Sequence, residues 1–265
     1  MGGMLASAWR FRHFIISSIV TEFRLRFARS RLGGFWMILH PLTQVMMYAL
    51  ILSSLLSAKL PGIVNNKHAY AIYLTAGILA WSLFTEVINR CLTLFIDNGN
   101  LMKKAKFPKI TLPLIVTGIA LVNNVLLLAA ILAIFTLLGH FPGAAALWLP
   151  ILMAITLAFG LGLGLILGVL NVFLRDIGQL VPVLLQLGFW FTPIAYMTSI
   201  IPENYRGWMT LNPMYHIVEN YQSVLVFNHM PDGIRLAVVG LLSLLALALA
   251  LFLFRKAAPE LVDVL

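Results

Sequence analysis

Long stretches without a charged residue are the feature that most limits what this chain can fold into. Charge-free, largely apolar runs cover residues 32–58, 68–85, 110–174, 177–202 and 236–254. A helix needs about 20 such residues to cross a membrane, whereas runs of about 10–14 suit the buried helices of soluble proteins. Only 10% of the 265 residues are charged, against ~25% in soluble domains. The sequence therefore predicts an all-α integral membrane protein.

Turn signals divide these runs into six expected transmembrane helices within one domain, residues 1–265. The run 110–174 is too long for a single crossing, because a helix rises only ~1.5 Å per residue. Its strongest turn cluster is Gly139–Gly143, which reads GHFPG. The expected helices cover residues 34–57, 69–90, 113–138, 146–172, 178–198 and 235–254.

The distribution of positive charge predicts the orientation of these helices. Fourteen of the 18 Lys and Arg residues precede the first helix, connect helices two and three or four and five, or follow the last helix. Cytoplasmic connections carry such an excess, so both termini are expected in the cytoplasm. The positive charge is thereby explained by the membrane, and no separate basic module for nucleic acid is present.

The segment before the first expected helix, residues 9–31, has the pattern of an amphipathic helix. Phe11, Ile15 and Ile19 recur every fourth position, and Arg10 and Arg24 lie away from them. An apolar face beside a basic face suits a membrane interface. Two interpretations stay open: a helix that also contacts a cytoplasmic partner, or a lipid anchor that only fixes the topology.

The expected cytoplasmic connection at residues 97–109 has the pattern of a short helix. Asp97 or Asn98 is a suitable N-cap, and Pro108 would end the helix. The apolar residues that this segment is expected to expose are Leu101, Met102 and Phe107. A partner's groove would explain them; the alternative is a basic loop held by lipid headgroups.

The connection on the opposite side, residues 199–234, is too long for a simple turn. It is expected to form either a re-entrant helical hairpin or a peripheral cap. Irregular backbone at membrane depth is tolerated only against protein or a water-filled cavity.

The chain lacks the residue patterns of an enzyme or an ion-coupled transporter. It has no GxxxxGK[ST] loop for ATP phosphates and no metal-ligand spacing. Its nine carboxylates are dispersed, whereas secondary transporters place ionisable groups inside their spans. We therefore predict no catalytic residue, metal or cofactor in this chain.

Three features within the spans are candidates for structure or function. Glu86 and Arg90, four residues apart, can form an ion pair that is either structural or functional. Gly160, Gly164 and Gly168 have the spacing of close helix packing, which we expect to be intramolecular rather than dimeric. The aromatic residues near helix ends form a headgroup belt or face a pore, where they would stack on sugars. These are Trp36, Trp81, Phe84, Phe189 and Trp190.

An ordered set of short motifs resembles one family of membrane proteins. The longer motifs are Arg24–Pro41, Gly77–Glu86 (GILAWSLFTE), Asn100–Pro113 (NLMKKAKFPKITLP) and Phe173–Gln186 (FLRDIGQLVPVLLQ), with Thr192-Pro193-Ile194 and Leu211-Asn212-Pro213 after them. Their order over nearly the whole chain is similar to the membrane subunit of polysaccharide-exporting ABC transporters. This is the ABC-2 membrane family, with its Wzm-type exporters of O-antigen, capsule and teichoic acid.

The resemblance implies a permease of the bacterial cytoplasmic (inner) membrane that exports lipid-linked polysaccharide as a homodimer. Two copies of a separate ATPase would bind ATP and Mg²⁺. Residues 9–31 would be the interface helix and 199–234 the outer gate, and the five aromatic residues become candidates for lining the channel. The coupling helix, 97–109, would contact the ATPase through Asn100, Leu101, Met102, Lys103, Lys104, Phe107 and Pro108. The residues expected to attract the carrier's pyrophosphate are Arg24, Arg26, Arg29 and Arg31.

Rival functions make different demands on the sequence. An ABC-2 exporter of drugs or small lipids would share the same motifs, so genomic context separates it from a polysaccharide exporter. A membrane-embedded glycosyl- or acyltransferase would need clustered catalytic Asp, Glu or His at one membrane face. A non-catalytic assembly subunit would not support export by purified components.

Overall fold

A computed structural model describes residues 9–27, 35, 36, 39, 43, 46, 47, 69–103, 108–198 and 201–264. Only scattered residues of the expected first span, 34–57, belong to this part of the chain. The helices are α2 (Arg12–Phe27), α5 (Ala69–Asp97), α6 (Gly99–Met102), α7 (Thr111–Leu137), η3 (Ala144–Trp148), α8 (Leu149–Phe173), α9 (Ile177–Phe191), α10 (Glu203–Met209), α11 (Pro213–Leu225) and α12 (Gly233–Val264). No strand occurs among the described residues, which confirms the all-helical prediction.

Four helical segments in this part of the chain are long and apolar enough to cross a membrane. They are α5, α7, η3 together with α8, and α12. Helix α9 is apolar but has only 15 residues, or about 22 Å at 1.5 Å per residue. The described residues therefore confirm a multi-span helical protein and contain fewer full spans than the predicted six.

Three predicted helix ends are wrong. The last helix was expected to end at residue 254, but α12 continues to Val264. The fifth helix was expected to reach residue 198, but α9 ends at Phe191 because Pro193 forces Thr192 into an extended conformation, with φ −110° and ψ 132°. Helix α5 was expected to end at residue 90, but it continues to Asp97. Glu86 and Arg90 therefore lie well inside α5 rather than at its end.

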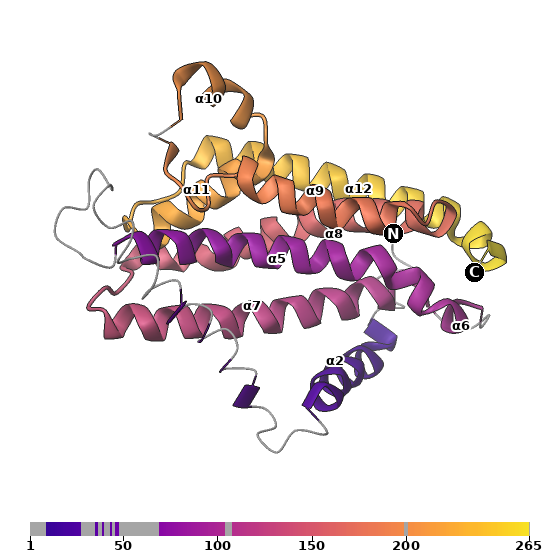
Figure 1. The fold of residues 1–265 in the computed structure, drawn as a ribbon. Coiled ribbons are helices and arrows are strands. Elements are labelled where there is room, and N and C mark those ends of the chain that lie inside the picture. The colour runs from indigo at the N-terminus through magenta and orange to yellow at the C-terminus, as the bar shows by residue number, and fades with distance from the viewer. Residues whose placement is uncertain are drawn as a thin grey trace.

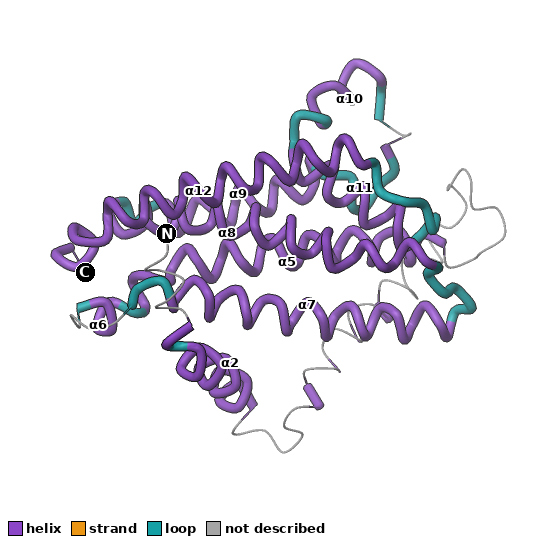
Figure 2. Tube along the Cα trace, turned by 180° about the vertical axis from the view of Figure 1, so that it is seen from behind, coloured by secondary structure: helices purple, strands orange, loops and turns teal. Residues whose placement is uncertain are grey.

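The long helices lie side by side along one axis (Figure 1). Helices α5 and α8 form the middle of the bundle, α7 covers one side and α9 with α12 the other, while α2 lies outside α7. Seen from behind, α6 and the end of α12 lie at one end, and α10 and the loop after α7 at the other (Figure 2). The expected cytoplasmic residues Lys103, Arg175 and Arg255 thus share one end of the bundle.

Glycine residues bring α8 close to α5. A methyl group at Gly160 would lie 3.3 Å from Val87 Cβ, and one at Gly164 would lie 2.9 Å from Cys91 Cβ. At Gly168 it would collide with the backbone oxygen of Cys91. The predicted intramolecular role of this glycine series is confirmed.

The region before α12 contains two helices in different surroundings. Helix α11 begins where the Asn212 side chain accepts a hydrogen bond from the Met214 N–H at 3.0 Å, and most of its residues are buried. Tyr221 is fully enclosed, and burial raises the pKa of its phenol, so this group stays neutral. Helix α10 has no buried residue. Part of 199–234 is therefore inserted among the other helices, and part is peripheral.

Candidate functional site

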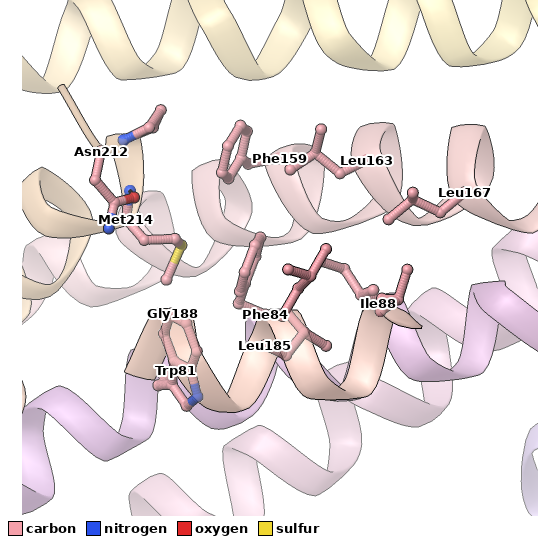
Figure 3. A pocket seen from close by; sticks show the side chains of 13 residues that line it. Trp81, Phe84, Ile88, Phe159, Leu163, Leu167, Leu185, Gly188, Asn212 and Met214 are labelled. Carbon is pink, nitrogen blue, oxygen red and sulfur yellow. Dashed lines mark hydrogen bonds between the residues drawn. The ribbon is translucent and has the colours of Figure 1, made fainter. Parts of the chain in front are cut away.

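An apolar cavity of about 320 Å³ lies among α5, α8, α9 and the start of α11. Helix α5 contributes Trp81, Phe84 and Ile88, and α8 contributes Phe159 among others. Asn212 is the main polar side chain of the lining (Figure 3). Such a surface suits hydrocarbon or the apolar faces of a ligand and has few groups to bind charge.

Aromatic contacts shape two walls of this cavity. The rings of Phe84 and Phe159 stack with centroids 5.5 Å apart, which joins the α5 wall to the α8 wall. Trp81 lies against α9, where a methyl group at Gly188 would come within 3.1 Å of its ring. Gly188 is a site residue that the sequence analysis missed, because a single glycine in an apolar helix has no distinctive spacing.

The five predicted aromatic residues occupy different surroundings. Trp81 and Phe84 line the cavity. Phe189 packs edge-on against Trp81, with ring centroids 6.0 Å apart. Trp190 is 61% exposed, and Trp36 is half-buried and absent from the cavity lining. Trp190 nevertheless packs edge-on against Phe189, with ring centroids 5.5 Å apart, so ring contacts join four of the five.

Side-chain hydrogen bonds hold the turn that follows α9, residues 192–196. Tyr70 donates to one of its carbonyl groups at 2.7 Å, and Tyr73 lies 3.3 Å from two others. Gln222 donates to a carbonyl of the turn at 3.1 Å, and Asn212 donates to the Thr192 hydroxyl at 3.0 Å. These side chains thereby give hydrogen bonds to backbone carbonyl groups that would have no partner in an apolar medium.

A charged network joins three helices. The predicted pair is confirmed: Arg90 Nε donates to Glu86 Oε1 at 2.9 Å. Asn123 of α7 donates to the same carboxylate oxygen, and Arg90 also reaches Glu22 of α2 at 3.5 Å. Glu22 and Asn123 were not predicted. Glu22 is the only carboxylate before Glu86, a signal that could have found it.

Helix α2 packs against α7 through an apolar stripe. The Ile19 side chain occupies the space that a side chain at Gly118 of α7 would need. The half-buried apolar residues are Phe11, Ile15, Ile19 and Phe23. Other apolar residues are exposed: Phe14, Ile16, Val20 and Leu25. The predicted separation into one apolar and one basic face is therefore wrong, because apolar residues occur around the helix.

A family comparison decides the class of this protein. Residues 14–226 match the model of the ABC-2 type transporter, which is most of the chain. The chain belongs to the ABC-2 type transporter family.

Several relatives of this ABC-2 chain are named for the export of O-antigen or the transport of polysialic acid. An O-antigen export system permease protein RfbA of Myxococcus xanthus is 28% identical over 259 residues, covering 97% of each chain. A Klebsiella pneumoniae protein of the same name is 27% identical over 237 residues, covering 83% of this chain and 86% of that one. The polysialic acid transport protein KpsM of Escherichia coli is 22% identical over 238 residues, covering 88% and 89%.

The predicted coupling segment of this ABC-2 protein differs from expectation at its helix end and at several residues. Pro108 was expected to end the helix, but α6 already ends at Met102. Asn98 stands at the start of α6 without capping it; its side chain instead donates to Leu94 O of α5 at 2.9 Å. Met102, expected to be exposed, is buried because it packs into the core beneath the segment.

The other predicted contacts of the segment vary in exposure. Asn100 and Lys103 are exposed, and Leu101 and Pro108 are half-buried. Lys104 and Phe107 lie outside the described residues.

Two of the four predicted pyrophosphate-binding arginines can be placed. Arg24 and Arg26 are exposed in the last turn of α2. Arg29 and Arg31 lie outside the described residues. The positive charge of these two exposed guanidinium groups favours an anionic headgroup nearby.

Proposed function

We propose that this chain is the membrane-spanning permease subunit of an ABC transporter that exports an O-antigen-like, lipid-linked polysaccharide across the bacterial inner membrane. The observation that carries the proposal is the end-to-end similarity to a protein named as an O-antigen export permease, over 97% of both chains. A separate ATPase subunit supplies the energy. Two copies of the chain form the conducting unit.

The cavity gives this proposal a place for the substrate to pass. Trp81 and Phe84 present aromatic surface to it, and aromatic faces stack against the apolar faces of sugar rings. Phe189 supports Trp81 from behind. In this proposal α5 and α9 face the conducting path, and α11 with α10 form its outer gate.

The end of the bundle that carries α6 is the cytoplasmic end in this proposal. Positive charge gathers there, as cytoplasmic connections require. Asn100, Leu101 and Lys103 contact the ATPase, and Met102 anchors the segment from below. A cysteine at Lys103 should react with an impermeant maleimide only after the membrane is opened, whereas one at exposed Tyr205 of α10 should react in intact spheroplasts. The reverse pattern would refute this orientation.

Arg24 and Arg26 attract the pyrophosphate of the lipid carrier in this proposal. Replacing both by Glu should lower export while membrane insertion and dimerisation persist. The matched control is the replacement of both Arg255 and Lys256 by Glu, at exposed positions of α12. Unchanged export by the Arg24 and Arg26 variant would remove this assignment.

The decisive experiment is reconstitution of the chain with its cognate ATPase in lipid vesicles. Lipid-linked glycan should stimulate ATP hydrolysis, and its sugar should cross the bilayer only with an ATPase able to hydrolyse ATP. The same vesicles are offered a panel of amphipathic drugs and short-chain phospholipids. Movement of these compounds without movement of lipid-linked glycan would refute the proposal in favour of a small-molecule exporter.

A further inference from the structure

Helix α2 packs against α7 through its apolar stripe and contacts α5 through an ion pair. Within the stripe, Ile19 lies against Gly118 of α7. The ion pair joins Glu22 Oε1 to Arg90 Nη1 of α5 at 3.5 Å. Helix α7 is the main helix neighbour of α2, so Arg90 is its direct polar connection to the helix that lines the cavity.

The two bonds of Arg90 differ in strength. Its bond to Glu86 is 2.9 Å long, and both of those side chains are 25% exposed. Glu22 is 47% exposed and lies 3.5 Å away. Exposed ion pairs contribute little to stability, and removal from water strengthens the electrostatic attraction itself. The Arg90 side chain therefore stays paired with Glu86 of its own helix, while its bond to Glu22 of α2 can break and re-form.

The network lies directly behind the cavity wall. Glu86 and Arg90 are one turn apart, and Phe84 and Ile88 precede them by two residues each. Two residues correspond to about 200° around a helix, so the two pairs lie on opposite faces of α5. A push or pull on Arg90 therefore moves the cavity face of α5 as a rigid surface.

We propose that Arg90 is a positioning residue that transmits the movement of α2 to the cavity wall through Glu22. Asn123 completes this network, because its side chain donates a hydrogen bond to the Glu86 carboxylate. That carboxylate in turn accepts from Arg90 and fixes its side chain. This inference rests on the proposed function in one respect, namely that an ATPase moves α2.

The test measures movement at the cavity without using glycan. Leu184 of α9 lines the cavity and is 52% exposed, so Leu184→Cys reports access to it. The complex with the ATPase is labelled with a maleimide, with and without ATP and Mg²⁺. We expect nucleotide to change the labelling rate, and Glu22→Gln to reduce that change by up to about fivefold, the most that an exposed ion pair contributes.

The matched control is Glu260→Gln, the same substitution at an exposed position of α12, which should keep the full nucleotide effect. Glu22→Gln keeps the shape of the side chain, and co-purification of the ATPase with an unchanged melting temperature shows that it folds. A labelling rate that nucleotide never changes, or a full nucleotide effect in Glu22→Gln, would overturn the inference.

A second pair of variants tests whether α2 has to move. Ile19→Cys with Gly118→Cys places two thiols where the Ile19 side chain now lies against the backbone of Gly118, within reach of a disulfide. Oxidation should abolish the nucleotide effect at Leu184→Cys, and reductant should restore it. A full nucleotide effect in the oxidised protein would also overturn the inference.

Glycan export by the same complexes separates this inference from the proposed function. If nucleotide moves the cavity through Glu22 but only small molecules are exported, the inference stands and the proposed substrate is wrong. If glycan is exported equally per ATP by wild type and Glu22→Gln, with the labelling response intact, the proposed function stands and Arg90 has no coupling role.

Discussion

Adding single methyl groups along the glycine face of α8 should destabilise the protein in a set order. Gly160, Gly164 and Gly168 meet α5 at successively shorter separations. The obstacle at Gly164 is Cys91 Cβ, whereas at Gly168 it is the Cys91 backbone oxygen, which cannot rotate away. The expected order of loss is therefore Gly160→Ala, then Gly164→Ala, then Gly168→Ala.

The structure gives the size of each effect. A methyl group at Gly164 would lie 2.9 Å from a carbon atom, and carbon atoms rest about 3.5–4.0 Å apart, so the helices must separate by about 0.6–1.1 Å. Overpacking of this kind costs about 1–3 kcal/mol. We expect Gly168→Ala near the upper limit. At Gly160, where 3.3 Å is available, the helix propensity of Ala offsets most of the cost, by up to about 1 kcal/mol.

Thermal unfolding in detergent, followed by size-exclusion fluorescence, measures this series. A chain of this size loses about 2–4 °C per kcal/mol, so Gly168→Ala should melt about 6–12 °C lower. Gly240→Ala in α12 is the control, because its nearest foreign atom is 3.8 Å away, an ordinary contact distance. Equal melting temperatures for Gly168→Ala and Gly240→Ala would refute the close approach of α5 and α8.

Three further substitutions test other parts of the structure by the same melting assay. Tyr73→Phe removes hydrogen bonds to the turn after α9 and should cost about 0.5–1.5 kcal/mol; an unchanged melting temperature would contradict that hold on the turn. Met102→Ala should cost about 2–5 kcal/mol because the side chain is buried, whereas exposed Lys103→Ala should stay within about 0.5 kcal/mol; equal effects would contradict the anchoring of α6. Asn124→Leu should cost less than about 1 kcal/mol. It removes a hydrogen bond to Leu79 O, but it also removes a buried oxygen that has no partner in the described chain. A loss above about 2 kcal/mol would refute the expectation that these two effects nearly cancel.

The sequence predicted what depends on runs and spacing. The charge-free runs predicted helical spans, and the glycine spacing predicted an intramolecular contact. The i,i+4 spacing of Glu86 and Arg90 predicted their ion pair. These signals are local, since one helix face is enough to define each of them.

Helix ends and contacts between helices were harder to predict. Residues 91–97 continue α5 because the core, rather than the charge at Arg90, determines where that helix leaves the bundle. Thr192-Pro193 marks the end of α9 in the sequence, but the apolar residues beyond it concealed the break. The hydrogen bond of Asn98 and the burial of Met102 depend on where α5 ends, and that position was predicted wrongly. Glu22 and Asn123 join the network only through tertiary packing.

The tight contact between α5 and α8 determines which part of the cavity can change width. Glycine residues and the stacked rings of Phe84 and Phe159 join these two helices, so their cavity faces travel together as one slab. The facing surface belongs to α9, whose contact with either helix is less extensive. Widening the cavity therefore amounts to sliding or tilting α9 against that slab, about the turn where Tyr73 holds its far end.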